Sequence, residues 1–177
     1  MILTGNAIHD AVVSGLIVIS PYDTKQLNPN SYNLRLGKKL LIYRLDSTKD
    51  GCLDMKEKNP TEELEIPEKG LVLYPNMLYL GETEEYTSTP HHVPCIEGRS
   101  SVGRLGMQVH LTAGFGDTGF NGKWTLEITV VHPLRVYAGT EICQISYQTV
   151  FGKISPYKGK YLGQNGVVPS CLFKDFE

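Results

Sequence analysis

The alternation of apolar and polar residues from Lys123 to Val130 limits the possible folds of this chain more than any other feature of its sequence. In the run KWTLEITV every second residue is apolar, which is the period of a half-buried β-strand. The run follows a glycine-rich stretch, Gly114–Gly119, whose letters GFGDTG match the dinucleotide-binding pattern G-x-G-x-x-G. That pattern requires a helix to begin there, so the alternation favours two strands joined by a turn and argues against a Rossmann fold.

The rest of the chain predicts a mainly β domain, a barrel or a sandwich of about ten short strands. A short helix, capped by Thr4 and ended by Gly15, precedes these strands. A charged stretch, residues 46–69, is expected to be a solvated excursion or an edge hairpin. Three further features are expected: two short strands around Gly37, a hairpin over 71–88 that turns at Pro75-Asn76, and a strand over 92–96.

Length, charge and cysteine pattern exclude several classes of protein. With 177 residues the chain is expected to form a single domain, residues 1–177, that ends in a glycine-rich tail at 152–177. Its net charge of -2 argues against a dedicated nucleic-acid binder. No apolar run approaches the ~18 residues of a membrane span, and the four cysteines form no C-x-x-C pair. We therefore expect a cytoplasmic protein that binds neither nucleic acid nor membrane.

Groups suited to a phosphorylated small molecule gather between residues 98 and 130. The segment RSSVGR carries Arg99 and Arg104, and a helix that starts there would present amide N–H groups to phosphate. In a helix, Ser100 and Arg104 would share one face. Two isolated acids follow, Asp117 in the glycine-rich turn and Glu127 in the alternating strand.

Four motifs closely resemble the dCTP deaminase family, which belongs to the dUTPase-like superfamily. They are EGRSSVGRLG at Glu97–Gly106, HLTAGFGDTGFNGKWTLEI at His110–Ile128, AGTEICQISY at Ala138–Tyr147 and YKGKYLGQNG at Tyr157–Gly166. The resemblance implies a distorted β-barrel or jelly-roll subunit with a short N-terminal helix and a short helix after the central strand. It also implies a homotrimer in which active sites form where subunits meet.

The resemblance assigns roles to individual residues of this chain. Glu127 would be the general base, with Ser100 and Arg104 near the reacting base of the nucleotide. Arg99 and the turn amides would face phosphate, and Asp117 would lie near the sugar and base. The full set of residues expected to bind the nucleotide is Arg99, Ser100, Ser101, Val102, Gly103, Arg104, Asp117, Thr125, Leu126, Glu127, Gln144, Tyr157, Lys160 and Gln164.

The expected reaction needs no metal bound by the protein. Zinc-dependent nucleobase deaminases use H-x-E and P-C-x-x-C motifs, and Pro94-Cys95 lacks the second cysteine. A carboxylate must then activate the water, which Glu127 can do. Mg²⁺ is expected to arrive on the substrate triphosphate, and dTTP is a candidate feedback inhibitor by resemblance.

Deamination of dCTP to dUTP is the favoured reaction, because the second serine of RSSVGR and the GF after Asp117 resemble deaminases. Gly114 also resembles bifunctional members that continue to dUMP and pyrophosphate, whereas Gly116 departs from the hydrophobic residue usual at that position. Two more functions stay open at this point, namely hydrolysis of dUTP alone and a regulator that binds nucleotide without turnover.

Simpler explanations exist for each candidate residue taken alone. Glu127 could be a solvent-facing strand residue, Asp117 a turn former and Arg104 a surface cation. His110 could shape the site or be an ordinary structural histidine, and His91-His92 are expected to be loop histidines because neighbours in an extended chain face opposite ways. The tail could close over a ligand, with lysine meeting phosphate, or be a frayed terminus.

Overall fold

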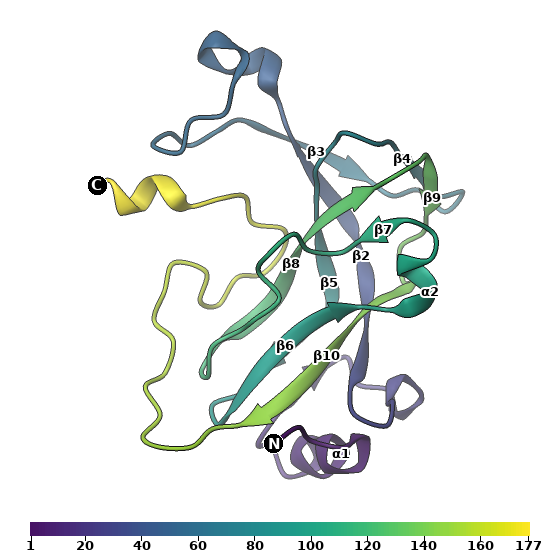
Figure 1. Ribbon diagram of the computed structural model, residues 1–177, viewed down its shortest axis with the longest axis vertical. Coiled ribbons are helices and arrows are strands. Elements are labelled where there is room, and N and C mark those ends of the chain that lie inside the picture. The colour runs from purple at the N-terminus through teal and green to yellow at the C-terminus, as the bar shows by residue number, and fades with distance from the viewer.

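The computed structural model describes all residues, 1–177, and shows a mainly β protein whose main sheet curls into a nearly closed antiparallel barrel (Figure 1). Its strands follow the order β6-β10-β2-β5-β8-β7, with β1 added to β5 and β3 added to β2. The strands of this sheet are β1 (Val18–Ser20), β2 (Tyr32–Tyr43), β3 (Thr61–Glu65), β5 (Tyr79–Ser88), β6 (His92–Gly98), β7 (Met107–Gln108), β8 (Asn121–Val130) and β10 (Glu141–Thr149). The predicted mainly β barrel class is therefore confirmed.

A glycine-rich turn closes the barrel at its β6 edge. Gly114 accepts a backbone hydrogen bond from Ile96 of β6 at 2.6 Å, and Gly116 donates one to Pro94 of the same strand at 2.8 Å. The unpaired edge of β6 is thus satisfied by the loop that leads into β8. The predicted strand at 92–96 exists and extends to Gly98.

Two helices punctuate the barrel, as expected. The first, α1 (Gly5–Val13), begins after Thr4, whose side chain accepts from the backbone N–H of Ala7. The second, α2 (Ser100–Gly103), follows β6 directly. The remaining helical segments are single 3₁₀ turns: η1 (Thr24–Gln26), η2 (Leu45–Ser47), η3 (Lys49–Gly51) and η4 (Leu172–Asp175). None of these helices has the length and the apolar character needed to cross a membrane.

Two strand predictions were wrong. Residues 32–43 form one long strand, β2, where two short strands around Gly37 were expected. A Cβ on Gly37 would lie 2.6 Å from Cγ of Glu82, so this glycine leaves room for a neighbouring side chain and does not break the strand. The predicted hairpin at 71–88 is absent because β4 (Leu71–Leu73) pairs with β9 (Leu134–Val136) in a separate two-stranded sheet.

A fully buried carboxylate links strands β2 and β5. Glu85 is fully buried, and its oxygens accept from the side chain of Gln26 and from both the backbone and the guanidinium of Arg35. The Arg35 Nε to Glu85 Oε1 distance is 2.6 Å. This pair ties β2 to β5 from inside the sheet.

We predict that Glu85→Gln lowers the free energy of unfolding by about 3 kcal/mol, because the guanidinium of Arg35 loses its buried counter-charge. Urea denaturation followed by the fluorescence of Trp124 measures the change. Glu63→Gln is the matched control, since Glu63 pairs with Lys39 in solvent and its loss should cost at most about 1 kcal/mol. Equal midpoints for the two variants would contradict the assigned role of the buried pair.

Candidate functional site

The alternation in β8 divides its side chains between the barrel interior and an outer face. Leu126 is 1% exposed and lies in the core, whereas its neighbour Glu127 points outward. The strand register places Glu127 opposite Leu80 of β5, and Leu80 in turn lies opposite Leu41 of β2. Directly paired residues share a face of the sheet, so Glu127 projects above an apolar surface made by its neighbours.

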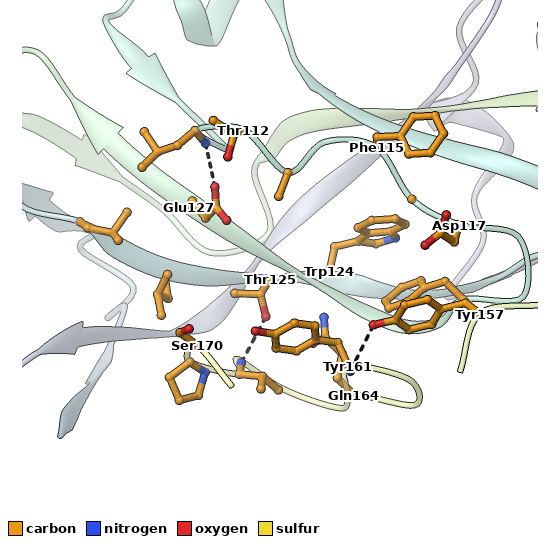
Figure 2. A pocket seen from close by; sticks show the side chains of 18 of the residues that line it. Thr112, Phe115, Asp117, Trp124, Thr125, Glu127, Tyr157, Tyr161, Gln164 and Ser170 are labelled. Atoms are coloured by element: carbon orange, nitrogen blue, oxygen red, sulfur yellow. Dashed lines mark hydrogen bonds between the residues drawn. The ribbon is translucent and has the colours of Figure 1, made fainter. Parts of the chain in front are cut away.

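A pocket of about 510 Å³ lies over this outer face, between the loop before β8 and the C-terminal tail. Figure 2 shows Glu127 near Thr112 at one end, with Asp117 and Tyr157 at the other and Thr125 between them. The residues that line it are mostly apolar or aromatic. A concave, largely apolar cavity with a few polar groups is the usual form of a small-molecule site.

One oxygen of Glu127 is fixed by the backbone. Its Oε2 accepts a hydrogen bond from the N–H of Leu111 at 2.9 Å, drawn as a dashed line in Figure 2. No other protein group donates to this carboxylate, so its second oxygen can accept a proton or a hydrogen bond from a bound molecule. The arrangement suits a general base, because the carboxylate is both oriented and accessible.

The tail is ordered and forms the lower wall of the pocket. Tyr157 donates its backbone N–H to Thr118, and Gln164 exchanges backbone and side-chain hydrogen bonds with Lys123 of β8. Further along, the N–H of Val168 donates to Oγ1 of Thr125 at 3.2 Å. These contacts favour the prediction of a tail that covers the site over the alternative of a frayed terminus.

Aromatic rings line the pocket beside Asp117. Phe120 and Trp124 pack with ring centroids 4.6 Å apart, and Tyr157 of the tail adds a third ring 6.1 Å from Phe120. Nε1 of Trp124 donates to Thr87 at 2.8 Å, which fixes the indole. Flat apolar surfaces of this kind pack against the face of a sugar or a base.

Close packing explains the two glycines of the turn. A Cβ on Gly114 would lie 2.4 Å from the carbonyl oxygen of Ile96, and one on Gly116 would lie 2.5 Å from Cη2 of Trp124. Both distances are shorter than real contacts allow, so this turn accepts no side chain at either position. The hydrophobic residue expected before Asp117 is therefore replaced by glycine because Trp124 fills the space.

Five of the predicted nucleotide-binding residues meet in this pocket: Asp117, Thr125, Glu127, Tyr157 and Gln164. Leu126 belongs to the core, so only its backbone could reach a ligand. Lys160 forms an ion pair with Asp175 and does not line the pocket. His110, whose role the sequence left open, has a buried Nδ1 without a hydrogen-bond partner and packs close to Gly114.

The other predicted residues lie away from the pocket of the same chain. The segment Arg99–Arg104 contributes nothing to the pocket lining, and α2 lies across the barrel from the tail (Figure 1). Arg99 donates to the backbone oxygen of Glu141 at 2.7 Å and approaches its carboxylate at 3.2 Å. Gln144 accepts from Ser31 and lines a smaller cavity of about 210 Å³.

Several pocket residues were not predicted from the sequence. They come from separate segments, namely Tyr43, Leu78 and Leu80, Leu111–Ala113, and Tyr161 with Val168–Ser170. Their shared location depends on the β2-β5-β8 register and on the path of the tail, neither of which a local pattern reveals. No group of three or more His, Cys, Asp or Glu side chains gathers anywhere in the chain to hold a metal ion.

Comparison with known proteins shows the family to which this chain belongs. The family model "dCTP deaminase-like" matches residues 2–150, so the chain belongs to the dCTP deaminase family. Proteins named "dCTP deaminase, dUMP-forming" from Leptospira biflexa and Cytophaga hutchinsonii are 60% and 58% identical over 100% of this chain and 99% of their own lengths.

A solved structure shows the same fold at lower identity. The 2'-deoxycytidine 5'-triphosphate deaminase from Agrobacterium tumefaciens superposes with a TM-score of 0.66 at 22% identity. The match covers 84% of this chain and 48% of that one, so this chain spans about half the length of the solved protein.

We predict that Gly116→Ala destabilises the protein by about 1–3 kcal/mol, because its new methyl group collides with Trp124 and Pro94. The midpoint of thermal or urea unfolding measures this cost. Gly103→Ala serves as the control, since a Cβ there meets no atom within 4 Å. A Gly116→Ala protein as stable as its Gly103→Ala counterpart would contradict the packing described for the turn.

Proposed function

We propose that this protein converts dCTP to dUMP. One water replaces the 4-amino group of cytosine and releases ammonia, and a second water cleaves the bond after the α-phosphate and releases pyrophosphate. The observation that carries the proposal is the oriented carboxylate of Glu127 in an otherwise apolar pocket. The names of the relatives that are 52–60% identical over essentially their whole length support the same reaction.

Glu127 takes the proton of the attacking water in this proposal. The Leu111 N–H holds one carboxylate oxygen, and the other faces the space where C4 of cytosine would lie. One proton of the water is then delivered to the amino group, which leaves as ammonia, and the other passes to ring N3 as the new C4–O bond becomes a carbonyl. Asp117 and Tyr157, at the far end of the pocket, would contact the sugar and the phosphate side (Figure 2).

A second copy of the chain would complete the site. The anion-binding segment Arg99–Arg104 is exposed or half-exposed and lies outside the pocket of its own chain. A homotrimer with head-to-tail contacts brings such a segment from one protomer to the pocket of the next. Ser100 and Arg104 of that neighbour would then stabilise charge that develops on the reacting base.

Mg²⁺ would enter on the triphosphate, because the chain gathers no ligand set of its own. Its role would be to neutralise phosphate charge during cleavage. Inhibition by dTTP and a cytoplasmic location, both expected from the sequence, stay predictions.

The proposed product, dUMP, differs from the product that the sequence favoured, which is dUTP. Release of dUTP was the first expectation and formation of dUMP the alternative, whereas the similar curated proteins are named dUMP-forming. Gly114, which suggested the alternative, packs against Ile96 and His110 with no room for a side chain.

We predict that the wild-type protein, supplied with dCTP and Mg²⁺, yields ammonia, dUMP and pyrophosphate without accumulating dUTP. Glu127→Gln should lower kcat at least about a hundredfold while dCTP still binds, because the amide cannot accept the proton of water. Chromatography of the nucleotides and calorimetric titration of the variant measure these outcomes.

Glu63→Gln is the matched control, since that carboxylate pairs with Lys39 on the surface. dUTP as the end product would show a deaminase only, and dUMP from dUTP alone would show a pyrophosphatase. Nucleotide binding without any turnover would show a regulator. Each of these results would overturn the proposed reaction.

A further inference from the structure

Tyr43 lies on the same face of the sheet as Glu127, although the two residues are far apart in sequence. The register aligns Leu41 of β2 with Leu80 of β5 and Leu80 with Glu127 of β8. Tyr43 is two residues beyond Leu41, so its side chain points to the side that Glu127 occupies. Both residues line the 510 Å³ pocket.

The spacing suits a ligand held between the two side chains. Two strand spacings across the sheet and two residues along β2 separate Tyr43 from Glu127, which is roughly 12 Å between backbone positions. A tyrosine and a glutamate that lean over this surface can both reach one planar ring. The floor between them is apolar, since Leu78 and Leu80 of the same face also line the pocket.

The hydroxyl of Tyr43 is oriented by the tail, and its O–H can still donate a hydrogen bond to a ligand. Its oxygen accepts the backbone N–H of Ser170 at 2.9 Å, and no protein atom accepts the phenolic O–H. Burial raises the pKa of Tyr43 above its ordinary value, and the Ser170 amide opposes that shift. The phenol therefore stays protonated at neutral pH and acts as a hydrogen-bond donor.

A pyrimidine ring presents the complementary pattern. Cytosine carries a 4-amino donor and two acceptors, N3 and O2, along one edge. Glu127 is an acceptor suited to the amino end, so a donor is required further along that edge. Several hydroxyls line the pocket, and that of Tyr43 combines a free O–H with a half-buried ring on the face of the sheet that carries Glu127.

We propose that the Tyr43 hydroxyl donates a hydrogen bond to a ring acceptor of the bound pyrimidine and so fixes the base in front of Glu127. The proposal rests on the proposed function, because it assigns a contact within that site. Since Ser170 of the tail donates to the same oxygen, closure of the tail orients the donor toward the base. Tyr43 is thus a substrate-binding residue whose geometry depends on the tail.

Tyr43→Phe tests the contact, because it keeps the ring and removes the hydroxyl. We expect KM for dCTP to rise roughly fivefold to tenfold, the effect of one lost hydrogen bond, with little change in kcat. Inorganic tripolyphosphate, which occupies only the phosphate side, should inhibit the variant and the wild type with equal Ki. Tyr74→Phe is the matched control, since Tyr74 is 54% exposed and lies outside the pocket.

The outcomes separate the inference from the proposed function. An unchanged KM for dCTP in an active Tyr43→Phe protein would overturn the contact and leave the function standing. An equal loss of tripolyphosphate inhibition would also overturn it, because the hydroxyl would then only anchor the tail. A wild-type protein that releases no ammonia would refute the function, and calorimetric titration of dCTP into both proteins would still test the contact.

Discussion

The antiparallel pairing of β8 with β5 is the constraint on which the rest of this structure depends. It sends Leu126 into the barrel and Glu127 outward, and a shift of one residue would exchange the two sides. The same pairing continues through Leu80 to β2, which brings Tyr43 to the face of the sheet that carries the carboxylate. The shared position of Glu127 and Tyr43 is therefore a consequence of strand register.

The tail covers that surface and is held there in part by hydrogen bonds from its backbone. No residue of 152–177 is fully buried, and Tyr157 and Tyr161 supply the contacts of this segment with the core. Its order also comes from backbone amides that donate to side-chain oxygens of the sheet, such as Val168 to Thr125 and Ser170 to Tyr43. A segment without fully buried residues belongs to the low-stability part of a protein.

Local patterns predicted what depends on local physics. The alternation in β8 predicted both the strand and the outward position of Glu127. Because no helix pattern follows Gly119, the sequence also argued against a dinucleotide-binding fold. The break predicted at Gly37 was wrong because this glycine makes room for Glu82. In the sequence alone, such a glycine cannot be distinguished from one that ends a strand. Tyr43 was missed because its place in the site depends on a register across three strands. The family resemblance predicted one nucleotide-binding set, but only part of it meets in the pocket. Arg99–Arg104 and the pocket lie on different sides of one chain.

We propose that the carboxylate of one protomer works with the arginine segment of the next. Subunit mixing tests it most directly: inactive Glu127→Gln and Arg104→Ala proteins are unfolded together in equal amounts, refolded and assayed for ammonia release from dCTP. Random assembly into symmetric rings should restore about a quarter of the wild-type activity, because that fraction of sites pairs an intact Glu127 with an intact Arg104. Mixed assemblies that stay as inactive as either parent would contradict a site shared between chains.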